Sequence, residues 1–213
     1  MTELINFGNL PSLAELSESL KDFAETVPVR PKEVYLKMDK TGHWVYGADQ
    51  TEIEPDSLWA VNPFSFVKGY ICWGAQNTPS MGKLLGEKMY TQFQKMPKEL
   101  PEDIPDSNGW EYQNGFSLSC ISGTDKGLQA RFMTKTKGGV PEVQRLSFEI
   151  HAHGLEDPST PIAIIKLKSA HYTHPAGYGR IYNPVLELVK FVSNETEPKA
   201  EDITEAPVRR RRG

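Results

Sequence analysis

The sequence has few cysteines and no long apolar segment, and both absences limit the class of protein. Only Cys72 and Cys120 occur in 213 residues, each inside a hydrophobic run typical of a strand. Two buried free thiols are therefore expected, and a disulfide framework is not. The apolar runs are far shorter than the roughly 20 residues of a membrane-spanning helix, and Glu3 and Asn6 stand where a secretory signal is basic. We expect a cytoplasmic protein without a membrane partner.

The chain also lacks net positive charge. Its formal net charge is −4 at pH 7, which argues against a protein that coats duplex DNA through bulk positive charge. The charges are unevenly distributed, because residues 126–145 carry five basic side chains against the single acid Glu142. A local basic surface on an acidic protein is one interpretation, and an ordinary solvated surface is the other.

Recognisable catalytic and metal-binding motifs are missing as well. The histidines within residues 151–153 and 171–174 have no nearby cysteines or paired carboxylates to complete a zinc site. The serines beside Cys120 do not form a nucleophile elbow, and Gly138-Gly139 lacks the further glycines of a phosphate-binding loop, so a mobile loop is expected there. We expect no enzyme activity, no metal and no cofactor. A metal-dependent nuclease that uses the acids of residues 99–106 is an alternative.

Proline and glycine are frequent, and the apolar residues follow short periodic patterns. The 16 prolines and 17 glycines favour turns and short strands over long helices. Apolar residues at three- and four-residue spacing predict one amphipathic helix at residues 11–23 and another within residues 141–153. We expect strands at residues 33–38, 43–46, two within 57–73 with a bend between them, and then 116–121, 127–134, 162–172 and 178–191.

This order of elements predicts a mainly β fold with one or two helices. We expect an N-terminal helical extension at 1–30, a single β domain at 31–193, and a disordered tail at 194–213 that is acidic first and then carries Arg209 to Arg212. Several strands, one helix and a final strand pair fit an OB-like Greek-key barrel, a barrel of the oligonucleotide-binding type. A β-sandwich uses similar elements and is the alternative.

The segment from Lys166 to Tyr182 interleaves tyrosines, cations and histidines around a turn. Bases stack on aromatic rings while cations follow a phosphate backbone, so a protein that holds single-stranded nucleic acid needs both on one surface. In an extended strand Lys166, Lys168 and Tyr172 share one face, and Arg180 and Tyr182 share a face of the returning strand. An exposed hairpin whose tyrosines only cover the edge of the core is the alternative interpretation.

Residues 43–74 resemble a family of phage and prophage proteins, and residues 178–192 belong to the same resemblance, which covers most of 33–193. It implies a viral or prophage origin and a role in the cytoplasm of the bacterial host, and it brings no active site. More weakly, the order of elements is similar to that of phage single-stranded DNA-binding proteins of the OB fold. Those chains typically end in an acidic tail, whereas here Arg209 to Arg212 follow the acids.

The leading hypothesis is a non-enzymatic single-stranded DNA-binding protein of phage DNA replication or recombination. Its partners would be single-stranded DNA and phage replication or recombination proteins, with a homo-oligomer as a further option. Besides the nuclease, a second alternative is a protein-interaction or virion-associated phage module that does not bind nucleic acid. The residues expected to contact the DNA backbone or to stack on its bases are Lys135, Lys137, Lys166, Lys168, Tyr172, Tyr178, Arg180 and Tyr182.

Overall fold

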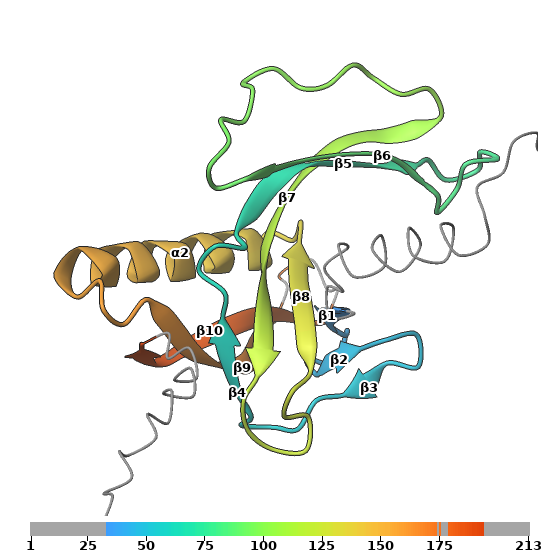
Figure 1. The fold of residues 1–213 in the computed structure, drawn as a ribbon. Helices are drawn as coiled ribbons and strands as arrows, with labels where there is room; N and C mark the ends of the chain where they lie inside the picture. Colours follow the sequence, from blue (N-terminus) through green and yellow to red (C-terminus); the bar gives the residue numbers. More distant parts are fainter. Residues whose placement is uncertain (1–32, 174, 176–178, 194–213) are drawn as a thin grey trace, which may run out of the picture. The chain divides into compact units, whose positions relative to one another are not determined.

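A computed structural model describes residues 33–173, 175 and 179–193 of the chain (Figure 1). The predicted helix at 11–23 and the predicted tail lie outside the described residues. The elements are β1 (Val34–Met38), β2 (Trp44–Tyr46), β3 (Thr51–Glu52), β4 (Leu58–Val61), β5 (Val67–Gly74), β6 (Leu84–Thr91), β7 (Ser107–Cys120), β8 (Gln129–Thr134), α2 (Gly139–Glu156), β9 (Ile162–Thr173) and β10 (Arg180–Val192).

The described strands form one open mixed sheet, which confirms the mainly β prediction. Its path runs β10-β9-β4-β7-β8-β1-β2-β3, so β10 and β3 are its two end strands. Neighbours along this path are antiparallel except β1 and β8, which are parallel. The finer prediction of an OB-like Greek-key barrel is not confirmed by this arrangement.

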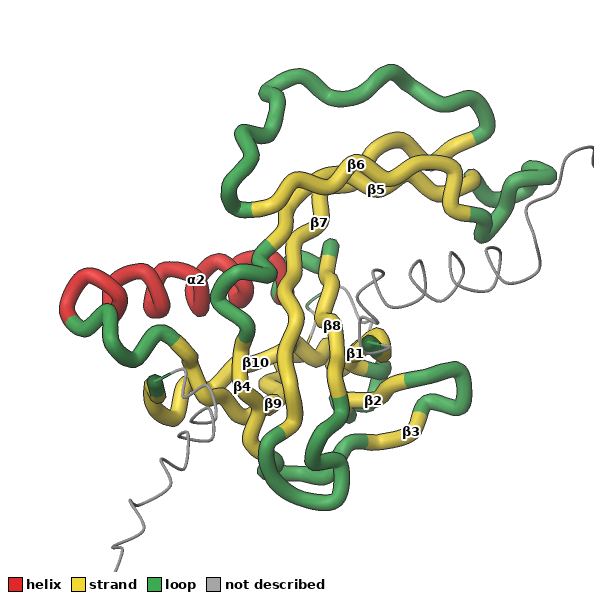
Figure 2. The backbone as a smooth tube through the Cα atoms, in the orientation of Figure 1, coloured by secondary structure: helices red, strands yellow, loops and turns green. Residues whose placement is uncertain are grey.

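The long strand β7 belongs to two parts of the sheet. Its second half pairs with β4 and β8 on the main path, while its first half pairs with β5. Strand β5 in turn pairs with β6, so β6, β5 and β7 form a three-stranded antiparallel arm with β5 in the middle. Figure 2 follows this arm away from the main sheet, with residues 92–106 looping between β6 and β7.

The core lies between the main sheet and α2. Trp59 and Phe116 from the sheet are fully buried, and so is Leu146 from the helix. These three belong to one hydrophobic cluster that also includes Ile165 of β9 and Leu186 of β10. The helix packs against β10 and β7, and its apolar residues at positions 143, 146 and 150 have the helical spacing that the sequence predicts.

Local sequence signals locate most elements within a few residues. The turn at 39–42 is confirmed: the Asp39 carboxylate accepts hydrogen bonds from the backbone N–H groups of Thr41 and His43, and Gly42 has φ of 89°. The expectation of a mobile loop at Gly138-Gly139 is wrong, because α2 begins at Gly139. A Cβ atom at Gly139 would lie 2.2 Å from Thr134 Oγ1, so close packing requires glycine there.

Candidate nucleic-acid interface

The β9–β10 hairpin does not bring the predicted contact residues onto one face. Directly paired residues of antiparallel strands point to the same side. The register pairs Tyr182 with His171 and Arg180 with Thr173. Tyr182 and Arg180 therefore lie on the face of odd-numbered β9 residues, whereas Lys166, Lys168 and Tyr172 lie on the opposite face. Tyr178 lies outside the described residues.

Three of the four lysines predicted to contact DNA form ion pairs with acids. Lys166 Nζ lies 3.3 Å from Asp56 Oδ1, and Lys168 forms an ion pair with the same oxygen. Hydrogen bonds from Lys168 and then from Lys166 lower the pKa of Asp56 below its ordinary value. Lys135 is likewise paired with a carboxylate, that of Glu111. These three cations are therefore less available to a phosphate backbone than their sequence pattern indicates.

The aromatic residues of the hairpin have packing roles of their own. The rings of Tyr182 and His171 have centroids 5.4 Å apart, and Tyr182 lies against Gly42, where a Cβ would be 2.3 Å from Cδ1 of the tyrosine. Tyr182 is half-buried and Tyr172 is exposed. Tyr182 therefore supports the turn between β1 and β2, and Tyr172 presents more ring surface to solvent.

A different surface, on the β6–β5–β7 arm, combines aromatic rings with lysines in register. One row across the three strands is Tyr90, Lys68 and Asn114, and the next row is Lys88, Tyr70 and Tyr112. Because paired residues share a face, these side chains lie together on one side of the arm. We call this surface the Tyr–Lys face and define it as Lys68, Tyr70, Lys88, Tyr90, Trp110, Tyr112 and Asn114.

The rings of the Tyr–Lys face are held at fixed places. Tyr70 and Tyr112 meet edge to face, with centroids 6.1 Å apart and an interplanar angle of 78°. Trp110 donates its indole N–H to the carbonyl oxygen of Glu102 at 2.9 Å. Partial burial raises the pKa of the Tyr112 hydroxyl, so this group stays protonated at neutral pH.

Charge is segregated between the two sides of the arm. Lys68 and Lys88 are exposed on the Tyr–Lys face, and within the described part of the chain neither has a carboxylate within ion-pair distance. Glu87 and Glu111 both pair with Ile71, which places them on the other side of the arm. The Tyr–Lys face therefore presents positive charge and π surfaces without opposing carboxylates from its own strands.

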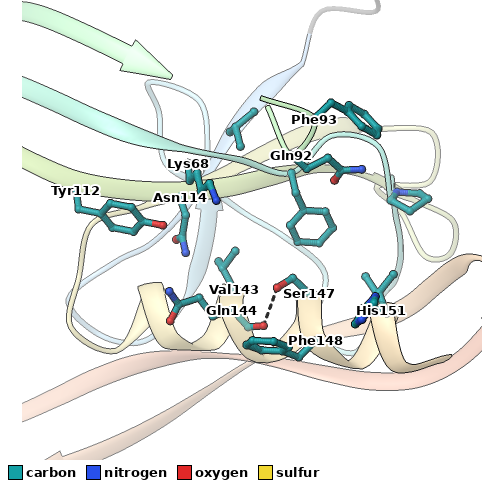
Figure 3. A pocket seen from close by; sticks show the side chains of 14 residues that line it. Lys68, Gln92, Phe93, Tyr112, Asn114, Val143, Gln144, Ser147, Phe148 and His151 are labelled. Carbon is teal, nitrogen blue, oxygen red and sulfur yellow. Dashed lines mark hydrogen bonds between the residues drawn. The ribbon is translucent and has the colours of Figure 1, made fainter. Parts of the chain in front are cut away.

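A groove of about 630 Å³ adjoins this face, between the arm and α2. Figure 3 shows Lys68, Tyr112 and Asn114 on the strand side and Gln144, Ser147, Phe148 and His151 on the helix side. The loop after β6 contributes Gln92 and Phe93. The remaining lining residues are mainly apolar: Pro63, Phe66, Val67, Val143 and Ile150.

The sequence contains a signal for the Tyr–Lys face that the strand predictions missed. A lysine or tryptophan precedes a tyrosine by two positions four times, and three of these pairs lie on the arm: Lys68/Tyr70, Lys88/Tyr90 and Trp110/Tyr112; the fourth is Trp44/Tyr46. In a strand this spacing puts both residues on one face. The signal was missed because residues 84–91 and 107–115 contain glycines and charges and were not identified as strands.

Comparison with known proteins yields no relative: no family model, no curated protein and no solved structure matches the chain. Over the described ranges, no group of three or more His, Cys, Asp or Glu side chains is arranged to hold a metal ion. Cys72 and Cys120 are buried and unpaired, as expected. None of the described helices is long and apolar enough to span a membrane.

Proposed function

We propose that this protein binds single-stranded DNA through the Tyr–Lys face, as a non-enzymatic component of phage DNA replication or recombination. The observation that carries the proposal is the register of the arm, which puts Lys68, Lys88 and three tyrosines on one face. The rings of this face are half-buried, and the ring surface that remains in solvent can stack on bases of any sequence, while lysines without a carboxylate partner attract phosphates. An open antiparallel sheet that carries both kinds of side chain suits an extended strand better than a duplex.

The proposal does not depend on a closed barrel. An OB-like fold remains the finer structural hypothesis, and the weak resemblance to phage single-stranded DNA-binding proteins is what favours it. The hairpin residues Lys166, Lys168 and Arg180 are proposed as secondary backbone contacts, because the acid Asp56 already occupies two of them. The other residues predicted from sequence are also proposed as secondary DNA contacts: Lys135, Lys137, Tyr172, Tyr178 and Tyr182.

The test is a fluorescence-anisotropy titration of a labelled single strand and of the matching duplex over a salt series. The full-length protein should prefer the single strand. Changing both lysines in Lys68→Ala/Lys88→Ala should lower the slope of log affinity against log salt by about 1.4, since each phosphate contact to a single strand contributes about 0.7. Tyr90→Leu and Tyr112→Leu should weaken binding at every salt concentration, because stacking is lost while the fold keeps an apolar side chain.

The control is the double variant Lys166→Ala/Lys168→Ala, which removes the same charge from the hairpin. It should change the salt slope less than the Lys68/Lys88 pair does. An equal or larger effect of the hairpin pair would move the interface back to the site predicted from sequence. Absence of any single-strand binding would contradict the proposed function.

A protein-interaction module is the second candidate, and one observation favours it. Phe148 and Leu155 on α2 are 71% and 75% exposed, and their seven-residue spacing puts them on one side of the helix. Exposed apolar residues in line on a helix are typical of a docking surface. Loss of partner or self-association after Leu155→Ala, in a protein that binds no oligonucleotide, would support this candidate.

A further inference from the structure

The groove beside α2 is continuous with the Tyr–Lys face. Lys68, Tyr112 and Asn114 belong to the face and also line the groove. A strand that lies along the face therefore reaches the groove without leaving contact with the arm. The volume of about 630 Å³ is within the range of small-ligand sites.

Aromatic rings border the groove and remain largely in solvent. Phe93, in the loop after β6, is 73% exposed, and Phe148 on α2 is 71% exposed. Leaving two large rings in water forgoes the free energy that burial of their apolar area would give. A flat apolar ligand that enters the groove would cover ring surface, which is the way unpaired bases stack on aromatic side chains.

The polar lining of the groove matches a base more closely than a hydrocarbon. Gln92 and Gln144 contribute side-chain amides, each with a donor and an acceptor for the edge of a base. Asn114 is buried and donates its amide N–H to the carbonyl oxygen of Val140, so only its Oδ1 is without a hydrogen bond among the described residues. The lining contains the cation Lys68 and the titratable His151 but no Asp or Glu. This charge balance is complementary to an anionic ligand such as a nucleotide.

We propose that the groove accepts an unpaired nucleobase of the strand that is bound on the Tyr–Lys face. This proposal rests on the proposed function and extends it from stacking and backbone contacts on the open face to a single base held in the groove. The base would lie against Phe93 and Phe148, with hydrogen bonds to the amides of Gln92 or Gln144. Bases in duplex DNA are paired and stacked, so the groove would contribute to single-strand preference.

The first test compares Phe148→Ala with Leu155→Ala in the anisotropy assay with a homothymidine strand. Both residues are similarly exposed on α2, but only Phe148 lines the groove. Phe148→Ala should lower the affinity about 5- to 150-fold, the range for one lost stacking contact, and should leave the salt slope unchanged. Phe148→Tyr should retain affinity because it keeps the ring, and Leu155→Ala should bind like the wild type.

The second test locates the base by photocrosslinking to an iodouracil-substituted strand. Crosslinks to Phe93 or Phe148, which line the groove but do not belong to the Tyr–Lys face, support the base site. Crosslinks confined to Tyr70, Tyr90 and Tyr112, or wild-type affinity of Phe148→Ala, overturn the base site while leaving the proposed function intact. Absence of both binding and crosslinks overturns both proposals.

Discussion

At the scale of single residues, Glu142 and Arg145 satisfy the backbone of Leu186 on the end strand β10. The Leu186 N–H donates to Glu142 Oε1 at 2.6 Å, and Arg145 Nη2 donates to the Leu186 carbonyl oxygen at 2.6 Å. Arg145 also donates to both carboxylate oxygens of Glu142, at 2.9 and 2.8 Å. Two side chains one helical turn apart thus fill the hydrogen bonds that a neighbouring strand would make.

Glu142→Gln should destabilise the fold by about 1 kcal/mol, since it keeps an acceptor for Leu186 but loses the charge that Arg145 contacts. The expected destabilisation is small because the Arg145 side chain is 41% exposed, so solvent screens its ion pair with Glu142. Chemical denaturation measures the change. Glu149→Gln is the control: within the described part of the chain Glu149 pairs with Arg145 and forms no hydrogen bond with β10, so its loss should cost under about 0.5 kcal/mol.

The same carboxylate predicts a pH dependence. Partial burial raises the pKa of Glu142, but hydrogen bonds from Arg145 and from the Leu186 N–H outweigh burial, so the folded-state pKa lies below the ordinary value of 4.5. Its contribution to stability is therefore complete above pH 4.5 and is lost as the pH falls through the lower folded-state pKa. Unfolding free energies of wild type and Glu142→Gln should converge as acid is added; a constant difference down to the acid limit would contradict this assignment.

At the scale of elements, the end strand β10 is protected by α2. An end strand with free N–H and C=O groups is a template for pairing with another chain. Glu142→Ala/Arg145→Ala removes the protection at Leu186 and should increase self-association, measured by sedimentation velocity over a concentration series. Glu149→Ala/Glu156→Ala, on the same helix, should stay at the wild-type association state. If Glu142→Ala/Arg145→Ala self-associates no more than the wild type, the backbone of α2 alone covers the edge of β10.

The β9–β10 hairpin provides a second test at this scale. Asp56→Asn removes the carboxylate that pairs with Lys166 and Lys168 and makes both cations available. If the Tyr–Lys face is the interface, single-strand affinity should change less than about twofold at moderate salt, because the charge gained lies on another surface and is screened. A large gain in affinity with a steeper salt slope would identify the hairpin as the main contact. Anisotropy with the same labelled strand measures both quantities.

At the scale of the whole molecule, the net charge is negative, yet the Tyr–Lys face carries Lys68 and Lys88 without carboxylates from its own strands. The tail adds a separate cluster, Arg209 to Arg212, which follows several acids. Removing the residues after Asn194 should lower salt-sensitive binding to single strand and duplex alike, because arginine charge does not distinguish them. Preference for the single strand should survive. Loss of that preference would assign recognition to the tail, and the comparison needs only the truncated and full-length proteins.

Much of the secondary structure could be predicted from sequence because its signals are local. The turn at 39–42, both strands of the β9–β10 hairpin and the helix after β8 follow from turn residues and apolar spacing. Strand β6 was missed because its pattern of buried and exposed residues is not a simple alternation. The first half of β7 was missed because its partners lie in β5, more than thirty residues earlier.

The sequence by itself determined the composition of this protein, its mainly β character, its unpaired buried thiols and the positions of most turns, since all of these depend on residue type and short-range periodicity. Only the tertiary structure decided which charges are free and which rings share a face. Those properties depend on strand register and on contacts between distant residues, as when Asp56 forms ion pairs with both Lys166 and Lys168 and β5 aligns Lys68 with Tyr90. A shift of one residue in register would reverse every such assignment.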